Sequence, residues 1–198
     1  MRIAILSDIH DHIWHLKATL AFLAQDDVEA LICCGDLCSP FIMARLGREF
    51  AGEIHLVFGN NDADTWRITQ IAQEFGERVH IYGELAKFEL GGRKFAVNHY
   101  PAIARELGAA GNFDVVCFGH NHRREVNRFS TRGHEVIMIN PGTLMGVRFE
   151  AGNPVVVPAT FSVLDMDEDD VESYTVQGGP EPESWQVEKT SQKRKKEA

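Results

Sequence analysis

The sequence lacks the long apolar segment that a secretory signal peptide or a membrane-spanning helix requires. Only the apolar run Ile3–Leu6 separates Arg2 from the polar pair Ser7 and Asp8, and this run is far shorter than the apolar region of a signal peptide. No other run approaches the roughly 20 apolar residues of a membrane span. We therefore expect a cytoplasmic protein without a membrane partner.

Cysteine is also scarce. Four cysteines in 198 residues have neither the density nor the spacing of the disulfide framework of a small secreted domain. Three of them, Cys33, Cys34 and Cys117, lie in or next to apolar runs and are expected to be small buried side chains in a reducing compartment. Cys34 and Cys38 are too isolated to form a convincing zinc pair.

An excess of positive charge is missing as well. The chain has 20 Lys and Arg against 29 Asp and Glu, a net charge of −9, which argues against binding to nucleic acid or to an anionic membrane. An anionic substrate is not excluded, because bound divalent cations can reverse the local field. A glycine-rich phosphate loop of either usual type is absent too, which argues against a nucleoside-phosphate-binding domain.

What the sequence does have is a regular alternation of apolar runs and helical periodicity. Predicted strands cover Ile3–Leu6, Ala30–Cys34, Ile54–Phe58, Lys94–Asn98 and Val115–Phe118, and predicted helices cover residues 12–25, 40–50, 64–75 and 101–110. Runs that are apolar throughout are typical of strands covered on both faces. The alternation therefore indicates an α/β architecture.

The later part of the sequence predicts hairpins and then a tail. Further strands are expected at Phe88–Leu90, Glu135–Ile139, Thr160–Leu164 and Val171–Val176. From Gln177 onward Gly, Pro, Glu, Ser and Lys dominate, and no apolar period remains. We therefore expect one domain at residues 1–176 and a disordered tail at residues 177–198.

Metal-binding residue types follow each of the first five predicted strands. The seven candidate ligands are Asp8, His10, Asp36, Asn60, His99, His120 and His122. In an open α/β sheet, ligands bind at the edge where the carboxyl ends of the strands meet. Oxygen and imidazole ligands suit Mn²⁺, Fe²⁺, Co²⁺, Ni²⁺ or Zn²⁺ better than Mg²⁺ or Ca²⁺. Seven ligands fit two cations, which can share a carboxylate and clamp a phosphoryl group between them.

The order of these motifs resembles the signature of the calcineurin-like metallophosphoesterases. The matching segments are Asp8-x-His10, Gly35-Asp36, Gly59-Asn60-x-Asp62, His99 and Gly119-His120-x-His122. The short chain, Asp11-His12 and the segment Asn140–Thr143 resemble the small prokaryotic phosphodiesterase branch. The resemblance covers about residues 1–165 and implies a four-layer α/β/β/α sandwich of two mixed β-sheets.

The resemblance also implies a role for each ligand. The first metal would be held by Asp8, His10, Asp36 and His122, and the second by Asp36, Asn60, His99 and His120. Asp36 would bridge the two cations, Mn²⁺ being the expected metal, and a metal-bridging hydroxide would attack phosphorus. His120 and Asn60 would also contact the reacting phosphate ester, a small-molecule phosphodiester.

One position departs from the family pattern. Many larger relatives carry a histidine where this chain has Asn61, and that histidine can protonate the leaving group, whereas an amide cannot. His12 is the available replacement acid, and its alternative role is that of a polar residue near a helix start. Asp62 is expected to support a ligand histidine. Three arginines that follow the last motif could contact a substrate phosphate or be solvated: Arg123, Arg124 and Arg128.

Alternatives remain to the phosphodiesterase. One is a phosphomonoesterase of the same fold, and the other is a non-catalytic protein-interaction scaffold, because a eukaryotic retromer subunit resembles this branch. The sequence also leaves open whether the chain forms a homo-oligomer. Four further histidines lie off the ligand pattern and are expected to be ordinary packing or surface residues: His15, His55, His80 and His134.

Overall fold

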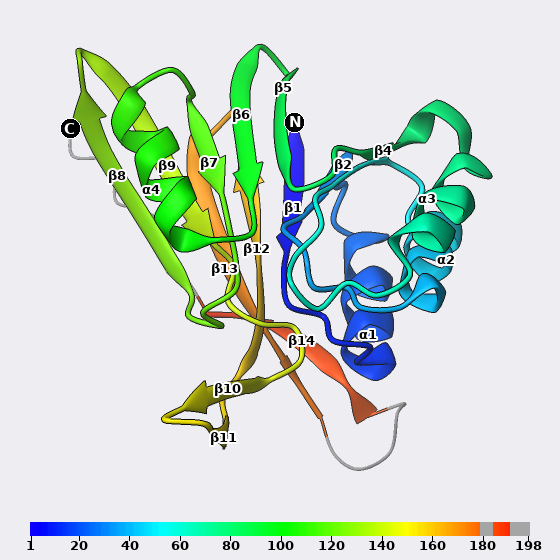
Figure 1. Ribbon diagram of the computed structural model, residues 1–198. Helices are drawn as coiled ribbons and strands as arrows, with labels where there is room; N and C mark the ends of the chain where they lie inside the picture. The colour runs from blue at the N-terminus through cyan, green and yellow to red at the C-terminus, as the bar shows by residue number, and fades with distance from the viewer. Residues whose placement is uncertain (179–183, 191–198) are drawn as a thin grey trace.

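The computed structural model describes residues 1–178 and 184–190, in which two β-sheets pack face to face (Figure 1). The larger sheet contains β1 (Arg2–Leu6), β2 (Ala30–Cys33), β3 (Glu53–Leu56), β4 (Val79–Ile81), β12 (Ala159–Asp165), β13 (Asp170–Gln177) and β14 (Gln186–Lys189). Its strand order is β14-β13-β12-β1-β2-β3-β4. Strands β1 to β4 are parallel, and β12, β13 and β14 join them through antiparallel pairs.

The smaller sheet is also mixed. It contains β5 (Leu85–Leu90), β6 (Arg93–Asn98), β7 (Val115–Cys117), β8 (Glu125–Thr131) and β9 (His134–Asn140) in the order β5-β6-β7-β9-β8. Strands β6, β7 and β9 are parallel, and the two outer strands are antiparallel to their neighbours. A separate hairpin is formed by β10 (Val147–Glu150) and β11 (Asn153–Val156).

Helices cover the outer faces of both sheets. They are α1 (Ile13–Leu23), α2 (Pro40–Glu49), α3 (Thr65–Gln73) and α4 (Pro101–Ala110), with a short 3-10 turn at Gly76–Arg78. The first three pack on the larger sheet and α4 packs on the smaller one (Figure 1). The predicted four-layer sandwich of two mixed sheets is therefore confirmed. Within the described residues, no helix has the length and apolar character to cross a membrane.

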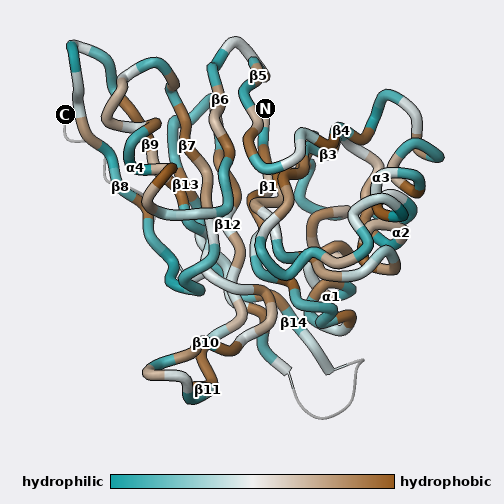
Figure 2. Tube along the Cα trace, in the orientation of Figure 1, coloured by the Kyte–Doolittle hydropathy of each residue, from teal (hydrophilic) through white to brown (hydrophobic). Residues whose placement is uncertain are grey.

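Strand β1 shows why the sequence patterns are apolar throughout. Its residues Ala4 and Leu6 face the helices, whereas Ile3 and Ile5 face the smaller sheet, and all four are fully buried. Each such Leu or Ile contributes roughly 1.5–3 kcal/mol by leaving water. Figure 2 shows the central strands as largely apolar and β8 as largely hydrophilic. That polar composition explains why the sequence does not predict β8.

The predicted disordered tail is wrong for the segment that contains β14. This strand pairs with β13, with Val187 opposite Val176. Trp185 and Val187 pack against the core beneath α1, so two alternate apolar side chains are enough to attach a segment that is otherwise polar. The rest of the predicted tail, residues 179–183 and 191–198, lies outside the described residues.

Candidate metal centre

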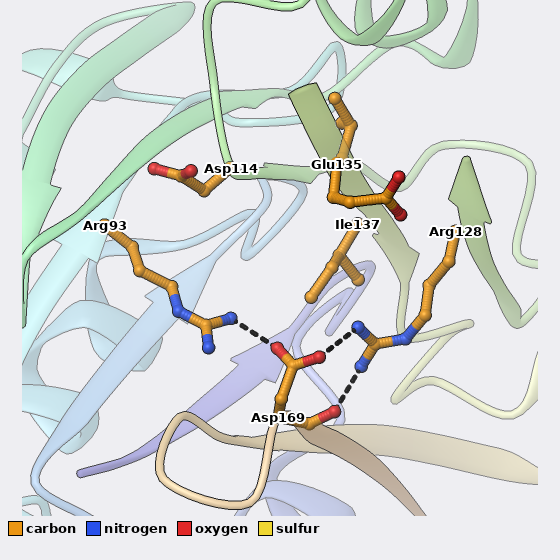
Figure 3. A pocket seen from close by; sticks show the side chains of 7 residues that line it. Arg93, Asp114, Arg128, Glu135, Ile137 and Asp169 are labelled. Carbon is orange, nitrogen blue, oxygen red and sulfur yellow. Dashed lines mark hydrogen bonds and ion pairs between the residues drawn. The ribbon is translucent and has the colours of Figure 1, made fainter. Parts of the chain in front are cut away.

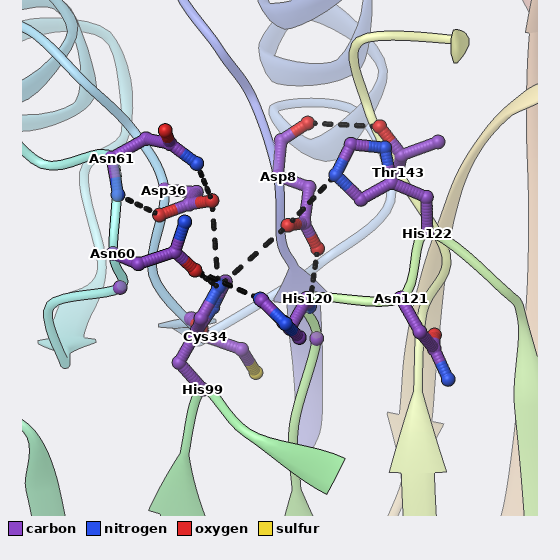
Figure 4. Close-up of polar contacts among 12 residues, drawn as sticks. Asp8, Cys34, Asp36, Asn60, Asn61, His99, His120, Asn121, His122 and Thr143 are labelled. Carbon is purple, nitrogen blue, oxygen red and sulfur yellow. Dashed lines mark hydrogen bonds and ion pairs between the residues drawn. The ribbon is translucent and has the colours of Figure 1, made fainter. Parts of the chain in front are cut away.

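The structure brings all seven predicted ligands together at the carboxyl ends of five strands. Asp8 and His10 follow β1, Asp36 follows β2, Asn60 follows β3, His99 follows β6, and His120 and His122 follow β7. Figure 4 shows the side chains of both aspartates and of His99, His120 and His122 directed toward one another. The expected convergence is thus observed, and the role of each residue as a ligand stays a prediction.

The first group of possible ligands is Asp8, His10 and His122. Their nearest ligand atoms all lie within 4.8 Å of one another. The Nε2 atom of His122 is 3.2 Å from Nε2 of His10 and 3.2 Å from Oδ1 of Asp8. These three residues therefore present two imidazoles and a carboxylate to one small volume.

The second group shares a residue with the first and consists of Asp8, Asp36 and His99. Nε2 of His99 lies 3.4 Å from Oδ2 of Asp36 and 4.0 Å from Oδ1 of Asp8. Asn60 joins this group, because its Oδ1 is 3.2 Å from Nε2 of His99 and 2.8 Å from Nδ1 of His120. Two adjacent groups thus contain all seven predicted ligands.

Asp36 belongs to the second group and also reaches the first. Its Oδ2 is 3.5 Å from Nε2 of His10 and 3.4 Å from Nε2 of His99, so one carboxylate reaches imidazoles of both. The side chain of Asn61 donates a 2.8 Å hydrogen bond to the same oxygen, and its backbone N–H donates one of 2.8 Å to Oδ1. Asn61 thus orients Asp36, a role that no sequence pattern indicates.

The Nδ1 hydrogen bonds of His99 and His122 indicate whether the site suits a cation, because they determine which ring nitrogen carries the lone pair. Nδ1 of His99 lies 2.8 Å from the backbone oxygen of Cys34, so the ring donates there and a neutral ring has its lone pair on Nε2. That lone pair faces the oxygens of Asn60 and Asp36. Acceptors that face acceptors repel unless a cation or a proton lies between them.

The same arrangement recurs at His122. Its Nδ1 donates to the backbone oxygen of Val147, which leaves the Nε2 lone pair facing Oδ1 of Asp8. This Asp8 oxygen is buried and has no hydrogen-bond partner within the described part of the chain. A buried oxygen without a partner costs about 1–3 kcal/mol. The donor set therefore fits divalent cations.

The charges of the site shift several pKa values. Burial raises the pKa of the Asp36 carboxyl, but hydrogen bonds from His99 and Asn61 outweigh burial and hold the pKa well below its usual value. Burial lowers the pKa of His99 and His122, but the Asp36 and Asp8 carboxylates outweigh it and raise both pKa values. The Asp36 carboxylate thus carries full negative charge at neutral pH.

The backbone around the ligands is unusual. Five of the seven candidate ligands have a positive φ angle: Asp8, His10, Asp36, His120 and His122. Residues other than glycine rarely adopt this conformation, and such strain concentrates at functional sites. Gly35, with a φ of 98°, has no room for a side chain, because an added Cβ would lie 2.8 Å from Nδ1 of His99.

Asp62 holds two of these loops in place. Its carboxylate accepts hydrogen bonds from the backbone N–H groups of Asp36, Cys38 and Gly59 at 3.0, 2.8 and 2.7 Å. The sequence predicts that Asp62 supports a ligand histidine, and the structure shows it supporting backbone instead. Burial raises the pKa of this carboxyl, although the three N–H groups oppose that shift.

The candidate ligands differ in solvent exposure. Asp8, Asp36 and His99 are buried, whereas Asn60 and His120 are exposed, as is Asn61. The site is therefore open to solvent on the side of Asn60 and His120.

His12 caps helix α1. Its Nδ1 accepts a 3.2 Å hydrogen bond from the backbone N–H of His15, and the two rings stack with centroids 3.5 Å apart. Accepting at Nδ1 places the proton of the neutral ring on Nε2. The structure thus supports the helix-start role and leaves the Nε2 proton for other uses.

Arg128 pairs with a carboxylate and is neither solvated alone nor free to contact a substrate phosphate. Arg128 and Arg93 both pair with Asp169, at 2.8 and 2.7 Å, in a pocket lined also by Asp114 and Glu135 (Figure 3). Asp169 lies in the turn between β12 and β13, beside the start of β1 and therefore at the edge opposite the ligands. The pocket is lined by two guanidinium groups and three carboxylates, so it offers no excess positive charge to an anion.

Other supporting residues escape the sequence analysis because they act through backbone atoms or from distant segments. Thr143 donates from Oγ1 to the backbone oxygen of Asp8 at 3.0 Å. The carbonyl groups of Cys34 and Val147 orient His99 and His122. Only the Thr143 segment had a signal, through its resemblance to the small phosphodiesterases.

Comparison with known proteins agrees with this geometry. Residues 1–169 match the calcineurin-like phosphoesterase superfamily domain. Phosphodiesterase MJ0936 of Methanocaldococcus jannaschii is 27% identical over 169 residues, which cover 84% of this chain and 94% of that protein.

Two solved structures illustrate the range of similar folds. A novel archaeal phosphodiesterase superposes with a TM-score of 0.76 at 25% identity, covering 88% of this chain and 99% of the other. Vps29 of Entamoeba histolytica, solved as a complex with Zn²⁺, superposes with a TM-score of 0.65 at 19% identity, covering 96% of this chain and 98% of the other. At this low identity, the match to Vps29 shows a shared fold alone. The chain therefore belongs to the calcineurin-like phosphoesterase superfamily, the family of metal-dependent phosphoric ester hydrolases that its motifs predict.

Proposed function

We propose that the chain is a dinuclear metal-dependent phosphodiesterase that acts on small phosphodiesters. The observation that carries this proposal is the convergence of two ligand groups that share Asp8, with Asp36 of the second group also within reach of His10 in the first. Two divalent cations, with Mn²⁺ as the proposed metal, would supply hydroxide near neutral pH and neutralise charge on the phosphoryl oxygens. A cytoplasmic location stays a prediction of the sequence.

The residues of the chain have separate tasks in this proposal. His120 and Asn60, at the exposed side of the site, contact the phosphoryl group, and the imidazole of His120 donates to a phosphoryl oxygen as charge develops there. Asn61 keeps the Asp36 carboxylate in one orientation through two hydrogen bonds. Asp62 fixes the loops that bear Asp36 and Asn60.

His12 is the proposed donor of the proton to the leaving group. Its Nδ1 is occupied by the helix cap, so the proton of the neutral ring is on Nε2. Burial lowers the pKa of His12. The ring is an effective acid only when both nitrogens are protonated, and it then gives up the cap bond at Nδ1. No such proton is available from the amide of Asn61.

A diester substrate is favoured over a monoester by the charges around the site. A monoester carries one more negative charge, and an additional cation would be needed to bind it. Of the three arginines that follow the last motif, Arg128 is paired with Asp169 and Arg124 donates to Ser173. The archaeal phosphodiesterases among the similar proteins support the same choice.

The scaffold alternative rests on the likeness of the fold to Vps29. The full set of seven candidate ligands, the strained backbone at five of them and the Asp8 oxygen without a hydrogen-bond partner among the described residues all favour cation binding. Cation binding alone does not separate the two functions, because Vps29 was itself solved with Zn²⁺. The enzyme is favoured because the chain is 27% identical to a phosphodiesterase and only 19% identical to Vps29.

Turnover of bis(p-nitrophenyl) phosphate with added Mn²⁺ tests the proposal. We expect Asp36→Asn and His120→Ala each to lower kcat/KM by roughly a hundredfold or more, because one removes charge between the two groups and the other removes an exposed imidazole. His134→Gln is the matched control, since His134 pairs with Asp114 outside the site. A metal-loaded protein that hydrolyses neither diesters nor monoesters would favour the scaffold, and preference for monoesters would overturn the proposed substrate class.

A further inference from the structure

A second cluster of metal-binding side chains lies at the edge of the larger sheet, outside the metal centre. Glu53 and His55 are alternate residues of β3 and therefore share one face, and His80 lies opposite His55 on the parallel neighbour β4. Glu53 is the first residue of β3, whereas the metal-centre residue Asn60 follows the other end of that strand. The sequence analysis assigns both histidines only packing or surface roles.

The three side chains are close enough to share one ion. Oε1 of Glu53 lies 2.8 Å from Nε2 of His80 and 3.6 Å from Nε2 of His55, and the ligand atoms all fall within 4.8 Å of one another. Metal–ligand bonds of 2.0–2.2 Å place neighbouring ligand atoms of a tetrahedral site about 3.4 Å apart. The two measured distances lie on either side of that value, so small side-chain movements suffice.

His55 shows that this cluster is more than a surface ion pair. The side chain is 4% exposed, and its Nε2 atom, which faces Glu53, is buried without a hydrogen-bond partner among the described residues. Glu53 already has a close partner in His80, and 3.6 Å is too long for a hydrogen bond from His55. A buried polar atom that faces a carboxylate without bonding to it is the feature that a cation would satisfy.

The ring of His55 is also held in the orientation that a ligand needs. Its Nδ1 lies 2.9 Å from the hydroxyl of Tyr82, and its ring stacks on Phe88 at a centroid distance of 4.1 Å. Ligand histidines commonly bond through their second nitrogen to an oxygen that fixes the ring. Burial lowers the pKa of His55 to about 4, so the imidazole is neutral when metal is offered at neutral pH.

We propose that Glu53, His55 and His80 form an additional binding site for one borderline divalent cation, of which Zn²⁺ is the best match. Two imidazoles and one carboxylate are typical ligands of this ion, and water would complete the tetrahedron. Glu53 and His80 are 40% and 35% exposed at their side chains, so an ion can enter from solvent. This site is independent of the proposed hydrolase function.

A cation here would act on the edge of the sheet. Strand β4 is an edge strand of only three residues, and each of them is only partly buried. An ion bound to both strands would hold β4 against β3 and would also fix the ring that stacks on β5 through Phe88. The expected consequence is stabilisation of this edge and no change in turnover.

Zinc stoichiometry of the full chain tests the proposal. After removal of bound metal, equilibrium dialysis against Zn²⁺ with elemental analysis should give one equivalent less for His80→Gln and for Glu53→Gln than for the parent. His134→Gln should bind as many equivalents as the parent. His80 and Glu53 are chosen because both are partly exposed, whereas replacement of buried His55 could disturb folding.

A second measurement separates this site from the metal centre. In an Asp36→Asn background, Zn²⁺ should still raise the thermal midpoint, and the added His80→Gln change should reduce that rise. With Mn²⁺, phosphodiester turnover of His80→Gln should equal that of the parent. Equal zinc stoichiometry in the parent, His80→Gln and Glu53→Gln would overturn the inference, whatever the outcome of the activity assays.

Discussion

The Nε2 atoms of His10 and His122 lie 3.2 Å apart. Two nitrogens bound to one cation at about 2.1 Å would be separated by about 3.0–3.4 Å, depending on the coordination geometry. The two rings thus already have the spacing of metal ligands. His122 cannot offer a proton from Nε2 in its neutral form, because its proton is on Nδ1, bonded to Val147.

This relationship predicts that removal of metal lowers both activity and stability. Chelator-treated protein should lose phosphodiester turnover and regain it with Mn²⁺. At a cation concentration of a hundred times Kd, binding stabilises the fold by about 2.7 kcal/mol, a thermal shift of roughly 5–10 °C for a chain of this size. His10→Gln should reduce this response and His134→Gln should keep it. If chelation changed neither the thermal unfolding midpoint nor the phosphodiester turnover, the prediction would be contradicted.

Replacement of Asp62 should damage both the fold and the activity. In Asp62→Ala the backbone N–H groups of Asp36, Cys38 and Gly59 lose their acceptor. A buried group without a partner costs about 1–3 kcal/mol, and the cost is smaller at Cys38 and Gly59, which are only partly buried. We expect a loss of roughly 2–4 kcal/mol in urea unfolding and a fall of kcat/KM by about 10- to 100-fold. Asp64→Ala, which removes only the cap bond to Arg67 at the start of α3, is the control and should retain activity. An Asp62→Ala protein as active as the parent would show that the loops position themselves without this carboxylate.

Gly119→Ala should act directly on the metal centre. An added Cβ would lie 2.7 Å from Oδ2 of Asp8, an oxygen that accepts the backbone N–H of His120. The clash should displace Asp8 or the β7 loop, and we expect turnover and cation affinity both to fall by at least about tenfold. Gly152→Ala is the control: its φ of 81° is strained for alanine, but nothing lies near its Cβ. That variant should cost about 1 kcal/mol of stability and leave turnover unchanged.

The two possible roles of His12 can be separated with one substitution. His12→Asn keeps a good helix-capping residue but removes the ionisable proton. We expect unchanged stability, nearly unchanged turnover of p-nitrophenyl diesters, and a loss of about 10²-fold or more on alkyl diesters, whose poor leaving group needs an acid. Equal losses on both substrates, or none on either, would leave His12 with its capping role alone.

The sequence predicts the convergence of the ligands because that feature depends on local patterns. Runs that are apolar throughout, such as Ile3–Leu6, identify strands covered on both faces, and parallel strands of one sheet place their carboxyl ends together. The five strands belong to two sheets, so the approach of the two sheet edges to each other comes from the sandwich that the family resemblance implies. Helix starts at Pro40 and Pro101 match the structure, since proline suits the first helical position. Strand ends differ by a residue or two, as between the predicted Phe58 and the observed Leu56.

Features that depend on tertiary contacts are the ones that the sequence does not predict. Strand β8 is polar and is recognisable only from its pairing with β9, and β14 depends on the exposed edge of β13. Asp62 accepts hydrogen bonds from the backbone of Asp36 and Cys38, which lie 26 and 24 positions away in the sequence. Arg128 pairs with Asp169, which is 41 positions away. The hydrophobic periodicity of a sequence depends on local residues and therefore does not predict such contacts.

The buried ring of His15 should make the fold sensitive to acid. Nδ1 of His15 bonds to the backbone oxygen of Leu144 at 2.6 Å, and Trp185 packs edge-on against the ring. Burial, only partly opposed by the Leu144 carbonyl, lowers the pKa of His15 to about 4. The unfolded chain has a histidine pKa near 6.5, so it binds a proton at a higher pH than the fold does.

Stability is therefore unaffected by His15 above about pH 6.5 and is lost as the pH falls toward 4, by on the order of 2–3 kcal/mol near pH 4.5. His15→Gln retains an amide that can donate to Leu144 but does not titrate. Urea unfolding near pH 7 and near pH 4.5 should show a smaller acid loss in the variant than in the parent. Because the difference in unfolding free energy between the two pH values is compared, any pH-independent loss of stability from removing the ring cancels. An identical loss in both proteins would mean that His15 is protonated as readily in the fold as in the unfolded chain.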